Sequence, residues 1–280
     1  MGPLLAPLTG TSSEPGTIMD GQRIIDLFPL WAVFILMVGS ILSAVQAGYW
    51  IGTREKTHIE AGAKASAGET VGAALGLVAL MLAFTFNMAA TRHDNRRTLI
   101  ITEANAIGTT YLRAGLLAEP QRCKVRNLLR EYVEVRLKAV RDNDIAKGHA
   151  RSLELHEQLW KEAETAGTAN PGSIVVGLFI QTLNEVIDLH SRRIALGWRS
   201  RIPIAILGGL YLVSLAGFGS LGYQVGLSSG RKTTAALLMA VGFSIVMLLI
   251  ADLDRPQQGM LTVSQRALVD VLDSMKPTAP

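Results

Sequence analysis

The side chains that could bind a metal or act as a nucleophile are few and lie far apart in this sequence. The only cysteine, Cys123, lies between Arg122 and Lys124; basic neighbours can make a thiol reactive, but an ordinary helix residue is the simpler interpretation. The stretch 226–233, GLSSGRKT, differs from a phosphate-binding loop because three residues, not four, separate its glycines. We therefore predict no metal, no cofactor and no enzymatic activity. The histidines also lack cysteine or acidic partners at metal-site spacing; they are His58, His93, His149, His156 and His190.

A stronger functional signal is an apolar helix face that ends in a polar residue and a charged cluster. Leu80, Phe84 and Met88 are one helical turn apart, and Asn87 lies among them. Because lipid disfavours an amide, Asn87 is expected to face protein or a water-filled cavity. This pattern predicts a pore helix that is narrow within the bilayer and opens into a charged vestibule; a helix end with interfacial anchoring residues is the alternative. The vestibule residues would be Arg92, Asp94, Arg96, Arg97 and Glu103.

Four long uncharged stretches must position these residues. They cover 27–53, 70–91, 202–230 and 233–251, and a helix needs about 20 apolar residues to cross the hydrocarbon layer. The composition agrees, with 49% hydrophobic and only 18% charged residues, against about 25% charged in soluble domains. Because lipid offers no partners to backbone N–H and C=O groups, each stretch must be helical. The sequence therefore predicts an all-α membrane protein with four transmembrane helices.

Basic residues beside these stretches indicate the orientation. Four crossings place both termini and the long middle segment on one side, which has more Lys and Arg near the membrane than the other. The positive-inside rule makes that side cytoplasmic. We accordingly expect a disordered leader at 1–26, transmembrane pairs at 27–91 and 202–251, a cytoplasmic helical block at 92–201 and a cytoplasmic tail at 252–280.

The middle block has a helical pattern throughout. Residues 127–140, NLLREYVEVRLKAV, place apolar side chains at helical spacing. Breaks between helices are expected at 119–120 (Glu-Pro) and 170–172 (Asn-Pro-Gly). Residues 92–117 contain no early breaker, and residues 173–200 run toward the third span. We therefore expect the block to be continuous with the second and third transmembrane helices.

Two pairs of glycines in the spans have the spacing of helix-packing motifs. Gly72 and Gly76 lie in the second span, and Gly222 and Gly226 lie in the third. Small residues four apart allow the backbones of two helices to approach closely. The spacing fits packing within one chain and packing between subunits equally well.

Three segments support a family resemblance. They are FTFNMAATRHDNRR at 84–97, EANAIGTTYLR at 103–113 and ADLDRPQQG at 251–259, the last with Asp252, Asp254 and Pro256 after the fourth span. The order of parts (two spans, a long helical block, two spans and a tail) agrees with them. Over roughly residues 28–270 the chain resembles the bestrophin-like family of bacterial membrane proteins, distant relatives of bestrophin ion channels.

The resemblance implies a pentamer around a central axis, with the second span lining the pore. Leu80 and Phe84 fall on two of the three neck positions, while the third falls on Gly76, which has no side chain. Asn87 and Met88 would line the pore beside them. Vertebrate bestrophins bind calcium through a run of acidic residues after the last span, and only Asp252 and Asp254 of such a run remain here, so gating by calcium is not expected.

These features favour an oligomeric ion channel in the cell inner membrane, with both termini cytoplasmic. Its partners would be the lipid bilayer, further copies of the chain and inorganic ions. Arg92, Arg96 and Arg97 would slightly favour anions at the inner mouth, although Asp94 and Glu103 lie on the same helix. The alternative is a non-conducting scaffold or signalling protein whose cytoplasmic helices bind a partner. The net charge of +4 fits cytoplasmic loops, so we expect no nucleic acid.

Overall fold

The computed structural model describes residues 28–55, 61–196, 201–228, 234–255 and 259–275, and in these ranges it contains helices and no strand. The prediction of an all-α fold is confirmed. The expected leader at 1–26, the basic residues 231–232 and Pro256 lie outside the described residues. In chain order the helices are α1 (Leu30–Glu55), α2 (Ala61–Ala114), α3 (Gln121–Arg141), α4 (Ile145–Ala169), α5 (Ile174–Ile194), α6 (Ile204–Leu227), α7 (Thr234–Asp254) and α8 (Arg266–Ser274).

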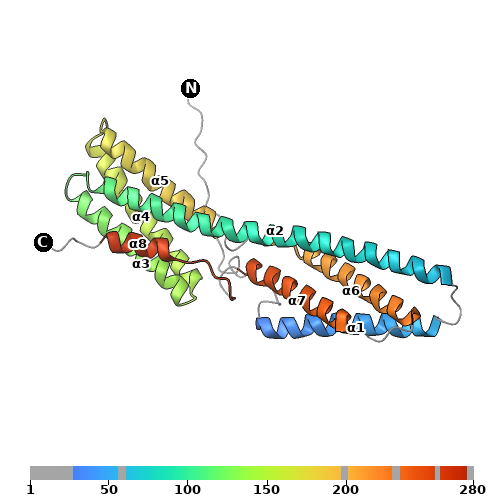
Figure 1. The fold of residues 1–280 in the computed structure, drawn as a ribbon. Coiled ribbons are helices and arrows are strands. Elements are labelled where there is room, and N and C mark those ends of the chain that lie inside the picture. Colours follow the sequence, from blue (N-terminus) through green and yellow to red (C-terminus); the bar gives the residue numbers. More distant parts are fainter. Residues whose placement is uncertain (1–27, 56–60, 197–200, 229–233, 256–258, 276–280) are drawn as a thin grey trace, which may run out of the picture.

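A single long helix, α2, joins two helical bundles. It has 54 residues, which corresponds to a length of about 80 Å at the rise of an α-helix. Helices α6 and α7 pack against one side of its first half, and α1 packs on α6 and α7; α3, α4, α5 and α8 form the bundle at its second half (Figure 1). The second span therefore continues directly into the middle block, as predicted.

The first bundle contains the helices that are suited to a membrane. Four segments are long and apolar enough to cross one, and they lie in α1, α2, α6 and α7. Their shared core includes Ile41, Leu210 and Ile250, and the rings of Phe218 and Phe243 meet edge-to-face at 5.4 Å. Large apolar side chains also cover the outside of this bundle, which is the arrangement that lipid requires.

Glycines bring α1 and α6 into backbone contact. A Cβ atom added to Gly222 would lie 2.0 Å from the carbonyl oxygen of Val45, and one added to Gly226 would lie 2.5 Å from that of Tyr49. On the facing helix, Gly48 and Gly52 pack just as closely on the backbone of α6. The second glycine pair therefore packs within the chain, whereas no described atom lies within 4 Å of a Cβ added to Gly72 or Gly76.

The entry into the third span differs from the prediction of a continuous helix. Helix α5 ends at Ile194 and α6 begins at Ile204, after Pro203. Proline lacks the N–H of a helical residue and disfavours helical geometry in the residue before it. The backbone N–H of that residue, Ile202, donates instead to Asp254 Oδ1 at 2.9 Å. This bond ties the start of the third span to the end of the fourth.

The second bundle, which we call the extramembrane block, is made of α3, α4, α5, α8 and the second half of α2. Its helices are separated at the predicted breaks near Pro120 and Pro171, and Ser173 caps α5 by accepting from Val176 N. Its core contains buried apolar side chains from all of these helices, such as Ile107, Phe179 and Leu268. Short amphipathic helices thus surround an extension of the second span.

Candidate functional site

One face of α2 is open over its whole membrane half. Leu80 is 53% exposed and Phe84 is 66% exposed, and Gly76 has open space beside it. Asn87 is exposed on the same face, and so is Asp94 two turns further on. We call Gly76, Leu80, Phe84, Asn87 and Asp94 the open face. An exposed amide within an apolar helix indicates that this face meets protein or water rather than lipid.

The opposite face of α2 is buried inside the chain. Val71, Val78, Thr85 and Ala89 are buried, and the last three lie where α6 and α7 pack. Met88, which was expected to line a pore, is half-buried and packs against this core. Met88 thus lies between the open face and the buried face of the helix, and its place beside a pore stays a prediction.

The predicted vestibule residues divide between the surface and the interior. Asp94 and Arg97 are exposed, and Arg92 is half-buried. Arg96 is only 6% exposed and donates from Nη2 to the carbonyl oxygen of Leu253 at the end of α7. Glu103 is completely buried. Arg96 and Glu103 therefore do not face a vestibule, because helical periodicity turns both toward the contacts between helices.

The acidic residues after the fourth span hold the chain at the junction of the two bundles. Asp252 accepts the backbone N–H groups of Met260 and Leu261, with shortest distances of 3.0 and 2.9 Å. Gly259 has a φ of +145°, and an added Cβ would lie 1.9 Å from Asp252 Oδ1. Asp252 and Asp254 are both buried, so they act in this structure as acceptors for backbone N–H groups.

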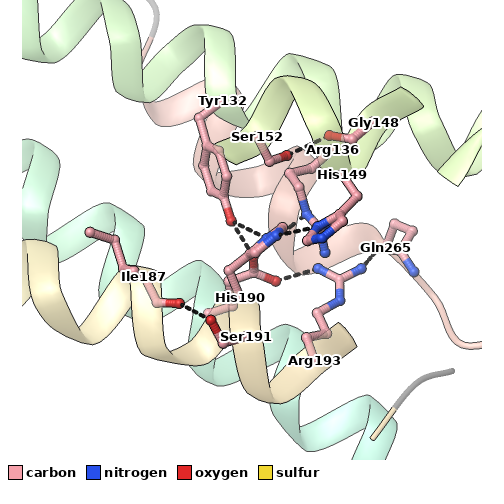
Figure 2. Close-up of polar contacts among 11 residues, drawn as sticks. Tyr132, Arg136, Gly148, His149, Ser152, Ile187, His190, Ser191, Arg193 and Gln265 are labelled. Atoms are coloured by element: carbon pink, nitrogen blue, oxygen red, sulfur yellow. Dashed lines mark hydrogen bonds and ion pairs between the residues drawn. The ribbon is translucent and has the colours of Figure 1, made fainter. Parts of the chain in front are cut away.

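A cluster of polar side chains lies inside the extramembrane block (Figure 2). The Tyr132 hydroxyl lies 2.7 Å from Glu103 Oε1 and 3.1 Å from His190 Nδ1. The other ring nitrogen of His190, Nε2, lies 3.0 Å from His149 Nδ1, and the ring of His156 meets that of His190 edge-on at 4.9 Å. Helices α2, α3, α4 and α5 each contribute to this cluster.

The hydrogen bonds of the cluster run in one direction. An ionised carboxylate can only accept, so the Tyr132 hydroxyl donates to Glu103 and accepts from His190 Nδ1. His190 Nε2 then has no hydrogen and accepts from His149 Nδ1. The chain of donors therefore leads from His149 to Glu103 and fixes one tautomer of each of the two histidines.

Two arginines balance the buried carboxylate. Arg193 donates to Glu103 Oε2, and Arg136 Nε lies 3.6 Å from Oε1. Burial alone would raise the pKa of Glu103, but the charges of Arg193 and Arg136, with hydrogen bonds from Arg193 and Tyr132, lower it. Glu103 is therefore ionised at neutral pH, and a buried ion pair of this kind is costly to break.

The histidines of the cluster are neutral at physiological pH. Burial, together with the charge of Arg136, lowers the pKa of His190 to about 2 and that of His156 to about 4. The same two causes lower the pKa of His149. Burial and the nearby charge of Glu103 also raise the pKa of Tyr132 well above its ordinary value. Protonation of the three histidine rings therefore destabilises the folded block.

Spacing along the chain indicates this cluster only weakly. His149 and His156 are seven residues apart and share the face of α4 that also carries the buried Leu155 and Leu159. A histidine on an apolar face can indicate a buried polar contact, but its partners on other helices cannot be identified from spacing. In the part of the chain that the structure describes, no group of three or more His, Cys, Asp or Glu side chains is placed to hold a metal ion.

Comparison with known families agrees with this architecture. The Bestrophin-like domain family matches residues 39–268, which include the open face, the polar cluster and the junction after α7. The chain belongs to the bestrophin-like family. No curated protein matches the chain.

Solved structures show the same bestrophin-like fold at low sequence identity. The crystal structure of a bacterial bestrophin homologue from Klebsiella pneumoniae, phased with zinc, superposes with a TM-score of 0.57 at 15% identity, covering 88% of this chain and 99% of that one. A single-substitution variant of that homologue gives a TM-score of 0.60 at 14% identity, covering 88% and 97%. A structure described only as a membrane protein gives 0.57 at 15% identity, covering 87% and 95%.

Proposed function

We propose that the protein is a bestrophin-like ion channel in which several copies surround a central pore lined by α2. The observation that carries this proposal is the open face of α2, on which Leu80, Phe84 and Asn87 follow one another without a partner among the described residues of the chain. A pore helix needs such a face, because bulky apolar side chains form the constriction and polar ones the mouth.

Family membership supports the further features of the proposal. The copies would form a homopentamer in the cell inner membrane, with both termini and the extramembrane block in the cytoplasm, as the basic residues favour. At the inner end of the open face, Asp94 and Arg97 are exposed while Arg96 is buried. With Arg96 buried, fewer than three arginines can attract anions at the inner mouth. The flux of anions and the flux of cations must therefore both be measured.

The proposal is tested by ion flux into liposomes that contain the purified protein. Chloride flux and sodium or potassium flux are measured separately, for the wild type and for Phe84→Ala. Removing this ring widens the constriction, so we expect the variant to conduct several times faster. Phe86→Ala is the matched control, because Phe86 is on the same helix two residues away, off the open face, and its loss should leave the flux unchanged.

Two results would contradict the proposal. One is the absence of flux of any ion above that of empty liposomes, from protein shown to be folded and oligomeric. The other is equal flux from the wild type and Phe84→Ala, which would remove Phe84 from the pore even if the protein conducts.

A further inference from the structure

A cavity of about 360 Å³ lies where α2, α3, α4 and α5 meet the segment that leads into α8. Pockets that bind small molecules usually have volumes of roughly 300–1,000 Å³. The cavity is separate from the open face of α2, since it is lined by Arg96 and Leu99 from the other side of that helix. It is therefore a candidate binding site that a pore does not require.

Three guanidinium groups line this cavity, those of Arg96, Arg136 and Arg193. Arg96 and Arg136 are each only 6% exposed. Nε and Nη1 of Arg96 are buried and have no hydrogen-bond acceptor among the described residues, while the buried Nε of Arg136 has only its ion pair with Glu103 at 3.6 Å. Buried donors of a charged group without acceptors are rare in folded proteins, because they lose water and gain nothing in return. These donors indicate that a ligand supplies the acceptors.

The charge of the cavity indicates an anion with more than one negative charge. Glu103 pairs with Arg193 and Arg136 from behind the cavity wall, so it balances one of the three positive charges. Near Arg96, the negative charge of Asp254 is offset by the positive charges of Arg201 and Arg92. The positive charge that is left matches a phosphate monoester, which carries roughly −1.5 to −2 at neutral pH.

The rest of the lining indicates what the phosphate is attached to. Leu99, Ile100 and Val140 form an apolar wall, and Gln265 adds an amide. Arginine side chains bind phosphate through paired N–H donors, and an apolar wall binds an organic group of a few carbon atoms. The lining is therefore suited to a phosphate on a short apolar body rather than to a bare inorganic ion.

We propose that this cavity binds a phosphate monoester, with its phosphate held by Arg96, Arg136 and Arg193 and its organic part against Leu99, Ile100 and Val140. A soluble metabolite and the headgroup of phosphatidic acid share this chemistry. The occupant would contact α2 together with three helices of the extramembrane block, so its binding would couple the two bundles. Binding needs no conduction and does not rest on the proposed channel function.

The test measures binding of monobutyl phosphate to the purified full-length protein in detergent by calorimetry, with butanol as the uncharged comparison. Thr262→Glu adds a negative charge at an exposed lining position that takes part in none of the buried hydrogen bonds. Thr262→Gln is its matched control, with the same length and no charge. We expect the wild type and Thr262→Gln to bind alike, and Thr262→Glu to bind about tenfold more weakly, equivalent to ~1.4 kcal/mol.

A second variant examines the arginines directly. Arg96→Gln should lower the affinity further, and circular dichroism confirms whether it is folded. No binding of monobutyl phosphate to the wild type, or equal affinity in Thr262→Glu and Thr262→Gln, would overturn the proposal.

The two sources of the phosphate are separated in nanodiscs of phosphatidylcholine with and without phosphatidic acid. If the headgroup is the ligand, phosphatidic acid will block monobutyl phosphate in the wild type and in Thr262→Gln. If a soluble ester is the ligand, the affinity will be the same in both kinds of disc. Either result supports the cavity as the site, provided that the Thr262→Glu effect is present.

Discussion

The hydroxyl of Tyr132 on α3 donates to the carboxylate of Glu103 on α2 over 2.7 Å, and both side chains are completely buried. The same hydroxyl accepts the last hydrogen bond of the chain that begins at His149. One contact thus joins the extension of the second span to three helices of the extramembrane block. We expect the stability of the block to depend on this buried contact more than on its surface ion pairs.

Replacing Tyr132 by phenylalanine removes this hydroxyl without changing the ring. Glu103 then loses a donor and His190 Nδ1 loses its acceptor, both in the interior. We expect the free energy of unfolding to fall by about 1–3 kcal/mol. Thermal unfolding of the detergent-solubilised protein, followed by circular dichroism, measures this loss.

Tyr223→Phe is the matched control for that substitution. Tyr223 also donates to a carboxylate at 2.7 Å, that of Glu55, but this bond is exposed. Water replaces the lost partner at an exposed site, so we expect a change of less than about 0.5 kcal/mol. An equal fall in the free energy of unfolding in the two variants would show that burial does not determine how much the Tyr132 hydrogen bond stabilises the protein.

Replacing Glu103 by glutamine leaves two arginines without their counter-charge. Arg193 and Arg136 are both buried beside Glu103, and removing one partner of a buried ion pair costs about 3–5 kcal/mol. We expect a large fall in the unfolding temperature. Glu134→Gln is the control, because Glu134 forms an exposed pair with Arg130 on α3, for which such a change costs about 0.5 kcal/mol or less. A similar small loss in both variants would contradict the buried pair.

Acid is expected to destabilise the extramembrane block below pH 6.5. The pKa of His156 is about 4 in the folded protein and about 6.5 when unfolded, so the unfolded chain binds more protons between these values. Stability is therefore unaffected above pH 6.5, falls as the pH drops below it, and has lost the full contribution below about pH 4. A pKa difference of this size corresponds to roughly 3 kcal/mol.

This pH dependence is measured as the unfolding temperature from about pH 7.5 down to about pH 4, the range over which the loss between the two pKa values (about 6.5 and about 4) develops. His156→Gln should reduce the slope of the profile in this range, while the lowered pKa values of His190 and His149 retain part of it. Glu103 adds a loss only at lower pH, because its pKa is lowered from the ordinary carboxylate value. A wild-type profile that is flat from pH 6.5 to 4.5 would rule out neutral buried histidines.

Close packing of α1 and α6 should not tolerate a side chain at Gly222. A methyl group there would lie 2.0 Å from the carbonyl oxygen of Val45, so Gly222→Ala must separate the helices. We expect a loss of about 1–3 kcal/mol. Gly208→Ala is the control on the same helix, since no described atom lies within 4 Å of the added methyl, and it should be neutral or slightly stabilising. Equal stability of the two variants would show that the backbones are not in contact.

The sequence by itself determined the all-α class, the apolar spans and the continuity of the second span with the extramembrane block. These features depend on local properties, namely long uncharged runs, the helical period of apolar residues and the positions of Pro120 and Pro171. It also indicated that Leu80, Phe84 and Asn87 share a face, because residues three and four apart do so on any helix. The resemblance to the bestrophin-like family came from segments 84–97, 103–113 and 251–259, and the family match over residues 39–268 then showed membership.

Only the tertiary structure decided which charged residues face outward and which are buried. Spacing on α2 does not say where α5 and α7 pack, so it could not show that Arg96 reaches Leu253 or that Glu103 meets Arg193, 90 residues later in the chain. The histidine cluster was hidden for the same reason, because His149 and His190 come from different helices. Buried charges and polar rings find their partners across the fold, and those partners are set by the packing of helices rather than by the local pattern of residues.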